Sequence, residues 1–161
     1  MLNAVPGKIV TREIVRHPGA VVIIPFVSPD KILLIRQFRY AANGDLWEIP
    51  AGTLESGEPT INCAKRELEE ETGFKASRWK LLARFYPAPG ISDELMTLYR
   101  ADGLKTGRKN LDHDEWIEHE TVSLAKAARM IRQGVIRDGK TIAAVLWARQ
   151  FPPPRASGGV R

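Results

Sequence analysis

The stretch that decides the fold covers residues 52–74 and reads GTLESGEPTINCAKRELEEETGF. It contains six glutamates, three of them consecutive at positions 69–71, although the whole chain carries a net charge of +5. Proline is well tolerated at the first position of a helix, and glycine often follows the last one. The stretch therefore predicts a helix that starts at Pro59, runs to Thr72 and stops at Gly73.

The predicted helix has two different faces. Three carboxylates crowd one of them, at positions spaced by three and four residues: Glu67, Glu70 and Glu71. A separate apolar stripe can pack on a sheet: Ile61, Ala64 and Leu68. Like charges at this spacing repel by roughly a few tenths of a kcal/mol each. Either a divalent cation such as Mg²⁺ or Mn²⁺ compensates them, or this is a solvated acidic face balanced by Lys65 and Arg66.

The spacing around the acidic run favours the cation. Over residues 52–74, every specified position matches the pattern G-x5-E-x7-R-E-U-x-E-E-x-G-U, in which U is apolar. This is the Nudix box, so the sequence resembles the Nudix hydrolases, which cleave nucleoside diphosphates linked to another moiety.

The resemblance implies a metal site on the acidic face. Its ligands would be the carboxylates of Glu67, Glu70 and Glu71, helped by a backbone carbonyl of Ala51 or Gly52. The implied cofactor is Mg²⁺, for which Mn²⁺ can substitute. Two or three such ions would bridge the phosphates and activate a water molecule. Glu67 and Glu71 are therefore also catalytic candidates.

Other residues of the box have supporting roles by the same resemblance. Arg66 would position the acidic face, and Glu58 would be its structural partner. Gly52 would allow a tight turn, and Gly73 would end the helix. Cys63 lies one turn before Glu67, and we interpret it as a packing residue because a thiolate is a poor ligand for Mg²⁺.

Segments outside the box resemble the ADP-ribose pyrophosphatase branch of the family. They cover residues 12–21, 35–40, 46–52, 86–94, 114–118 and 139–143. Within them, Pro89 stands at the place, about 15 residues past the box, where that branch carries a distinguishing proline. The resemblance therefore extends over nearly the whole chain except its tail.

That branch implies a set of residues for the substrate and the base. Arg39 and Arg12 would grip the diphosphate or the terminal ribose, a task that suits a guanidinium, although Arg12 can equally be a surface charge. Glu94 would bind ribose hydroxyls, and Trp47 would stack on adenine or belong to the core. Glu115, in the acidic loop 112–115, would act as the base or as an extra metal ligand, unless a box glutamate is the base.

The implied reaction is hydrolysis of the diphosphate linkage of ADP-ribose or a related nucleoside diphosphate sugar. The products would be AMP, or another nucleoside monophosphate, and a sugar phosphate. GDP-mannose or another sugar nucleotide is the nearest alternative substrate. A non-catalytic Nudix nucleotide sensor is the alternative from another class, but sensors commonly lose box glutamates, which are all present here.

The rest of the chain predicts a mixed sheet with two later helices. Strands are expected at residues 20–27 and 31–35, as a hairpin, and at 46–49, 79–86, 95–101 and 116–122. Helices are expected at 124–133 and 138–150. This order predicts an α+β fold, and the resemblance specifies the Nudix fold, an α/β/α sandwich with a mixed β-sheet.

Length and resemblance together predict the domain organisation. With 161 residues, we expect one Nudix domain at 1–150, including an amino-terminal strand region at about 1–17, and an irregular tail at 151–161. Members of this branch are usually homodimers that exchange their amino-terminal strands. The resemblance therefore implies a homodimer in which residues 8–17 are exchanged.

Composition bounds the partners and the compartment. The chain lacks an apolar run of the roughly 20 residues that a membrane span needs, and it does not start like a secretory signal. Its single cysteine fits a reducing compartment, so we expect a cytoplasmic protein. Basic residues are scattered along the sequence. Their modest excess favours solubility or attraction for a small phosphorylated ligand over a nucleic-acid partner.

Overall fold

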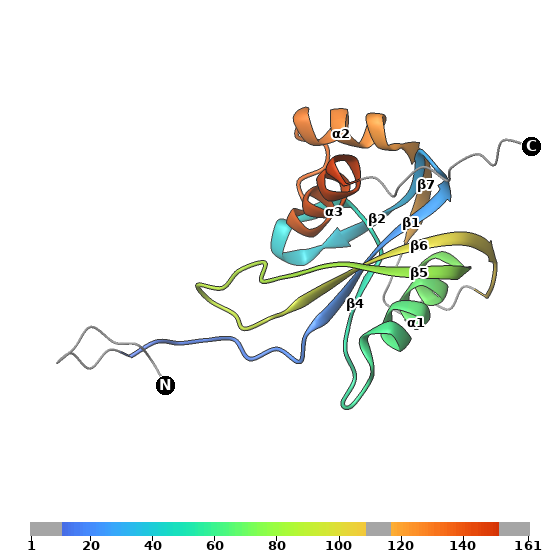
Figure 1. Cartoon of the computed structure of the whole chain (residues 1–161). Coiled ribbons are helices and arrows are strands. Elements are labelled where there is room, and N and C mark those ends of the chain that lie inside the picture. The colour runs from blue at the N-terminus through green and yellow to red at the C-terminus, as the bar shows by residue number, and fades with distance from the viewer. Residues whose placement is uncertain (1–10, 109–116, 152–161) are drawn as a thin grey trace, which may run out of the picture.

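The computed structural model describes residues 11–108 and 117–151 (Figure 1). Its strands are β1 (Ala20–Ser28), β2 (Lys31–Arg39), β3 (Gly44–Glu48), β4 (Ala51–Thr53), β5 (Phe74–Phe85), β6 (Met96–Thr106) and β7 (Glu118–Ser123). Its helices are η1 (Tyr40–Ala42, a 3-10 turn), α1 (Thr60–Thr72), α2 (Leu124–Arg132) and α3 (Gly139–Gln150). Within the described ranges, no helix has the length and apolar character required to cross a membrane.

The strand β1 is the centre of a single mixed sheet. The sheet has the order β3-β2-β1-β6-β5, while β4 pairs with β1 and β7 with β2. Strand β1 runs antiparallel to β2 and β4 but parallel to β6, which makes the sheet mixed. The expected hairpin of β1 and β2 is confirmed.

Side chains of β1 alternate between two separate cores because successive residues of a strand face opposite sides of its sheet. Val22 and Ile24 belong to the core beneath α2 and α3. Val21 and Ile23 belong to the core beneath α1. Helices therefore cover both faces of the sheet (Figure 1), and the expected α/β/α sandwich is confirmed.

The helix α1 forms nearly where the sequence predicts it. Ala64 and Leu68 of its apolar stripe are fully buried against the sheet. Gly73 ends the helix with a left-handed φ of 72°, and its N–H donates to the carbonyl of Glu69 at 2.8 Å. The predicted start was wrong by one residue, because Pro59 is extended, with ψ at 135°, and precedes the first helical residue.

Several strand boundaries differ from the prediction. Strand β2 continues to Arg39 rather than ending at 35, and β3 begins at Gly44 rather than at 46. Strand β5 begins at Phe74 rather than at 79, and β6 continues to Thr106 rather than ending at 101. Their added parts pair with each other and carry exposed polar residues, for which an apolar pattern gives no signal. Strand β4 has only three residues and was missed. Parts of the expected strand 116–122, strand region 1–17 and tail 151–161 lie outside the described residues.

Candidate active site

Arg66 lies at the centre of the acidic face of α1. Its Nε and Nη2 donate to the two carboxylate oxygens of Glu58 at 3.2 and 3.1 Å. Its Nη1 donates to Glu67 at 2.7 Å and to Glu70 at 3.0 Å. The bond to Glu58, with the nearby charge of Glu67, raises the pKa of Arg66, and the same bond lowers the pKa of Glu58. One guanidinium therefore compensates part of the repulsion between the carboxylates.

The backbone of β4 lies directly against the side chains of Glu71 and Glu67. Glu71 is 5% exposed, and its Oε2 accepts a hydrogen bond from the N–H of Ala51 at 3.1 Å. A Cβ built on Gly52 would lie 1.9 Å from Cδ of Glu67. The expectation that Gly52 serves a tight turn was wrong: this residue lies within β4, and its missing side chain leaves the space that Glu67 occupies.

This arrangement fits a hard divalent cation. Among residues 11–108 and 117–151, no three acidic, histidine or cysteine side chains are gathered closely enough to hold a metal ion as they stand. However, Glu67 and Glu71 both approach the backbone of β4, and only a glycine at position 52 permits the approach of Glu67. The donors at this place are oxygens, which Mg²⁺ prefers. The predicted ligands therefore stay the same: the carboxylates of Glu67, Glu70 and Glu71 and a backbone carbonyl of Ala51 or Gly52.

A second charged cluster joins β2, β3 and the start of α3. Glu48 is 1% exposed and receives both Nε and Nη2 of Arg39, at 2.9 and 2.8 Å. Lys140 bonds to the same carboxylate and also lies 3.1 Å from Asp138. Burial alone would raise the pKa of Glu48, but the bonds from Arg39 and Lys140 outweigh it and lower that pKa. The guanidinium of Arg39 is thereby held in one orientation.

The sequence did not lead us to predict a role for Glu48, the acidic residue of this cluster. Glu48 sits between apolar residues in a predicted strand, so its position signals a buried charge that needs a cationic partner. Arg39, which the resemblance assigns to the diphosphate or the terminal ribose, is that partner. It lies near enough to Glu71 for this carboxylate to help raise the pKa of Arg39. The two charged clusters are therefore neighbours.

Replacing Glu48 tests the cluster through stability. We expect Glu48→Gln to lower the free energy of unfolding by about 2 kcal/mol at pH 7. This is less than the roughly 3–5 kcal/mol lost when a fully buried ion pair is broken, because Arg39 is 38% exposed. The pKa of Glu48 is lowered by folding, so its stabilisation is complete above the ordinary value of 4.5 and disappears as the pH falls through the folded value. Urea unfolding across pH measures both effects.

The matched control for this variant is Glu120→Gln. Glu120 pairs with Lys126 at 2.6 Å, but the two side chains are 42% and 46% exposed. An exposed pair contributes at most about 1 kcal/mol, so we expect a much smaller change. Equal changes for both variants would contradict a special role of the buried carboxylate.

Comparison with known proteins identifies the family. The NUDIX domain matches residues 15–145, which is most of the chain. The chain belongs to the Nudix family. This confirms the family expected from residues 52–74.

Named relatives of this Nudix protein include two from Bacillus. The methanol dehydrogenase activator of Bacillus methanolicus is 42% identical over 141 residues, which cover 86% of this chain and 76% of the relative. The ADP-ribose pyrophosphatase of Bacillus subtilis is 39% identical with the same coverage. The crystal structure of an ADP compounds hydrolase superposes with a TM-score of 0.76 at 25% identity, over 82% of this chain and 71% of that chain.

Cys63 of the Nudix box is buried behind the acidic face. Its Sγ lies 3.5 Å from the carbonyl oxygen of Thr53 and 3.9 Å from that of Gly52. Burial, together with the charges of Glu58 and Glu67, raises the pKa of the thiol to about 12. A neutral thiol packed against β4 agrees with its interpretation as a packing residue.

This environment predicts an unreactive cysteine. With a pKa of about 12, the thiolate fraction at pH 8 is on the order of 10⁻⁴. We therefore expect iodoacetamide at pH 8 to label Cys63 about 1,000-fold more slowly in the folded protein than in guanidinium chloride, where the pKa returns to its ordinary value. Intact mass against time measures both rates. Equal rates would show that the thiol is accessible and ionised.

The remaining predicted residues come from other segments of the chain, and one of them lies outside the described residues. Arg12 is exposed, on a segment that leaves the sheet (Figure 1), and Glu94 lies 3.8 Å from His17. Trp47 is half-buried and packs against the core under α2 and α3, in line with its core alternative. Pro89 is exposed in the turn between β5 and β6. Glu115 lies outside the described residues.

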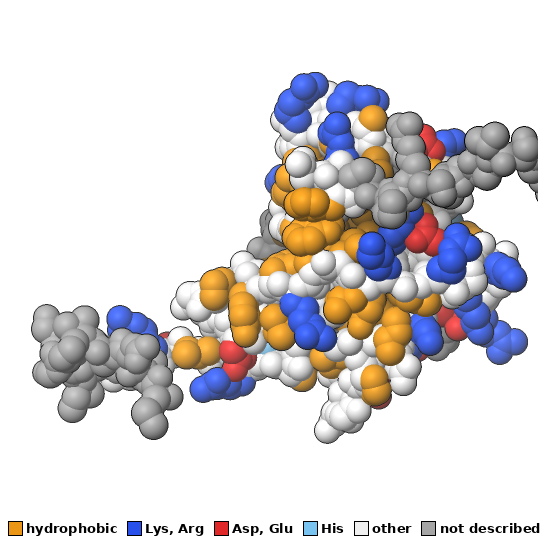
Figure 2. Space-filling view, viewed as in Figure 1, with side chains coloured by type: hydrophobic (Ala, Val, Ile, Leu, Met, Phe, Trp, Pro, Cys, Tyr) orange, Lys and Arg blue, Asp and Glu red, His pale blue; other side chains and the backbone are white. Residues whose placement is uncertain are grey.

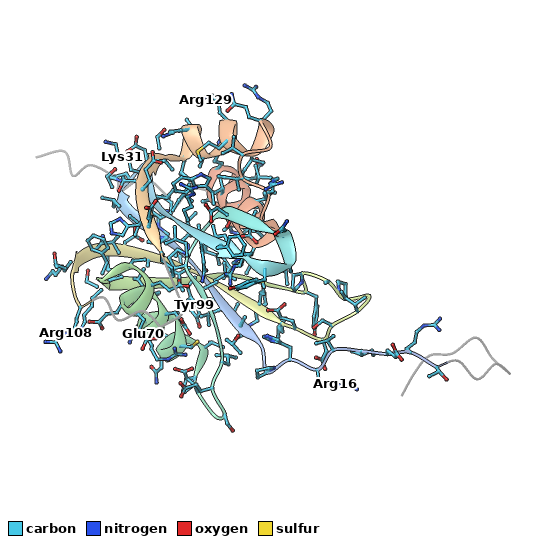
Figure 3. The ribbon with its side chains drawn as sticks, turned by 180° about the vertical axis from the view of Figure 1, so that it is seen from behind. Arg16, Lys31, Glu70, Tyr99, Arg108 and Arg129 are labelled. Carbon is cyan, nitrogen blue, oxygen red and sulfur yellow. The ribbon has the colours of Figure 1, made fainter. Side chains whose placement is uncertain are left out.

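Figure 3 shows where the acidic helix lies relative to the amino-terminal segment. Glu70 lies on α1, on the side of the sheet away from α2 and α3, and Arg16 lies on the segment that leaves the sheet. The structure brings the glutamates of the Nudix box, which are the predicted metal ligands, against the backbone of β4. The residues predicted to bind the substrate or to act as the base come from several other segments of the chain.

Proposed function

We propose that this Nudix protein hydrolyses the diphosphate linkage of ADP-ribose or a related nucleoside diphosphate sugar, with Mg²⁺ as cofactor. The products are AMP, or another nucleoside monophosphate, and a sugar phosphate. The observation that carries the proposal is the position of Glu67 and Glu71 against the backbone of β4, in the space that Gly52 leaves. The Bacillus subtilis relative and the branch-specific position of Pro89 support the substrate.

The chain's own residues orient the acidic face. Arg66 holds Glu67 and Glu70 at fixed positions, and Glu58 holds Arg66 through two bonds. Burial and the N–H of Ala51 orient Glu71. When bound, Mg²⁺ neutralises phosphate oxygens and makes an attacking water more acidic.

Two further residues complete the proposed chemistry. A guanidinium matches phosphate oxygens, so we expect Arg39 to bind the diphosphate. Its bonds to Glu48 and its proximity to Glu71 support this role. The proton of the attacking water goes to a carboxylate, which is Glu115 or a glutamate of the box.

A panel of substrates tests the proposal. The purified protein is incubated with Mg²⁺ and ADP-ribose, GDP-mannose, NADH or diadenosine polyphosphates, and released monophosphate is measured. We expect ADP-ribose to be cleaved fastest. Faster cleavage of GDP-mannose would assign the alternative substrate. Cleavage of none would favour a regulatory role, for which the relative named as a methanol dehydrogenase activator is the specific observation.

We also propose that the protein is a homodimer and that it is cytoplasmic. Residues 11–19 leave the sheet and bond to the turn after β5, where the N–H of Val15 donates to Ile91 at 2.8 Å and Arg16 pairs with Asp93 at 2.7 Å. The side chains of Val15 and Ile91 are 62% and 65% exposed, so an apolar surface is available here for a second copy. The buried thiol of Cys63 is compatible with a reducing compartment.

A charge placed on this surface tests the dimer. We expect Val15→Glu to weaken self-association at least tenfold, since a carboxylate would have to be buried without a partner. Val27→Glu is the control, because Val27 is 49% exposed at the other end of β1. Sedimentation across a concentration series measures both. A monomeric wild-type protein, or equal weakening by both variants, would contradict this interface.

A further inference from the structure

The segment that forms the last two helices has a clear excess of basic residues. Residues 124–151 contain six lysines and arginines but one aspartate, a net charge of +5 that equals the net charge of the whole chain. Figure 2 shows the blue side chains gathered over α2 at the top of the molecule. The basic residues are scattered in sequence, but the fold collects a group of them on one side.

Three of these residues converge on one groove. Arg129 and Arg132 of α2 and Arg149 of α3 line an open groove of about 370 Å³. Its other lining residues are Ala125 and Ala128, whose small side chains leave the space open. Arg129 lies on α2, on the side of the sheet opposite to Glu70 on α1 (Figure 3). The groove is therefore separate from the acidic face.

The three guanidinium groups have no carboxylate partner in the part of the chain that the structure describes. By contrast, neighbouring lysines are paired, Lys126 with Glu120 and Lys140 with Glu48 and Asp138. All three arginines are exposed and lie in the last turn of their helices, where a positive charge is favourable. The favourable position at a helix end does not require the three arginines to line the same groove. In that groove, their like charges repel one another. An anion in the groove would remove this repulsion.

The lining residues indicate the class of anion. A guanidinium fork matches the oxygens of a phosphate group better than an ammonium does. Three unpaired positive charges match a ligand with several negative charges, and the volume lies at the lower end of the roughly 300–1,000 Å³ of small-molecule sites. We propose that the groove between α2 and α3 binds a short chain of phosphates, as in an inorganic oligophosphate or a nucleoside triphosphate.

Calorimetric titration with tripolyphosphate tests this site. The buffer is depleted of divalent cations, so that the acidic face of α1 repels the probe. We expect saturable binding that Arg129→Gln, Arg132→Gln or Arg149→Gln each weakens about tenfold, and that the triple variant abolishes. Arg84→Gln is the control: Arg84 is exposed on β5 and, within the described ranges, also has no carboxylate partner. It should leave the affinity unchanged.

Further probes distinguish the sources of the phosphate chain. Equal affinity for ATP and tripolyphosphate assigns the site to the phosphate chain itself, and tighter binding of ATP assigns it to a nucleoside triphosphate. AMP that binds as well as tripolyphosphate would overturn the proposal. A single-stranded oligonucleotide that binds more tightly through the same arginines would also overturn it, in favour of a nucleic-acid surface. An equal loss of tripolyphosphate affinity in Arg84→Gln and in the groove variants would overturn the proposal as well. Unchanged sugar-nucleotide hydrolysis by the triple variant separates this site from the proposed active site.

Discussion

Glu67→Gln and Glu71→Gln are each expected to abolish ADP-ribose hydrolysis at saturating Mg²⁺, with a loss in kcat of about 10²- to 10³-fold or more. Each variant removes one negative charge from the predicted ligands and keeps the shape of the side chain. The amide oxygen of glutamine at position 71 can still accept the hydrogen bond from Ala51, so the fold should persist. Initial rates and thermal unfolding of the same preparations measure the two effects separately.

Glu69→Gln provides the matched control on the same helix. Glu69 is adjacent to Glu70 in sequence, but it pairs with Lys75 at 3.1 Å and accepts a hydrogen bond from the backbone of Arg108 at 3.1 Å. Its carboxylate therefore binds to residues in and next to the neighbouring strands β5 and β6 and does not belong to the predicted metal ligands. We expect nearly wild-type turnover. If all three variants lose activity equally, or if the Glu67 and Glu71 variants stay active, the assigned ligands are wrong.

Gly52→Ala is expected to reduce kcat/KM by about 100-fold with little change in stability. The added methyl group would lie 1.9 Å from Cδ of Glu67, so this carboxylate must move by more than an ångström, and displacement on that scale can cost about 10²-fold. The atoms that clash belong to the end of a flexible side chain, and the backbone at Gly52 has no left-handed φ. The fold can therefore accept alanine while the site cannot.

Gly44→Ala is the control for this effect. Gly44 begins β3, and a Cβ at this position meets nothing within 4 Å. We expect wild-type kcat/KM and an equal or slightly higher midpoint of thermal unfolding. Full activity of Gly52→Ala would show that Glu67 can act from another position.

The sequence predicts best where its signals are local. The apolar stripe of α1, its position after Pro59 and its stop at Gly73 depend on neighbouring residues, so the helix was placed within one residue. Strand β4 is too short to show a period, and the first part of β5 is too polar. These strands form because partners distant in sequence pair with them, β1 in one case and β6 in the other.

The site shows the same limit. The acidic face of α1 follows from helical spacing, whereas the reason for Gly52 depends on a side chain 15 residues later that folding brings against it. The partnership of Arg39 with Glu48 and Lys140 joins three elements, and helical or strand periodicity contains no information about it. Likewise, the convergence of Arg129, Arg132 and Arg149 requires the packing of α2 on α3.

The alternation of side chains along β1 has a consequence for how this protein can change. Val21 and Ile23 support the helix that carries the acidic residues, while Val22 and Ile24 support the two basic helices on the reverse side. Substitutions at odd and even positions of one strand thus act on different halves of the molecule. Selection, or an engineer, can remodel one half while the other keeps its geometry.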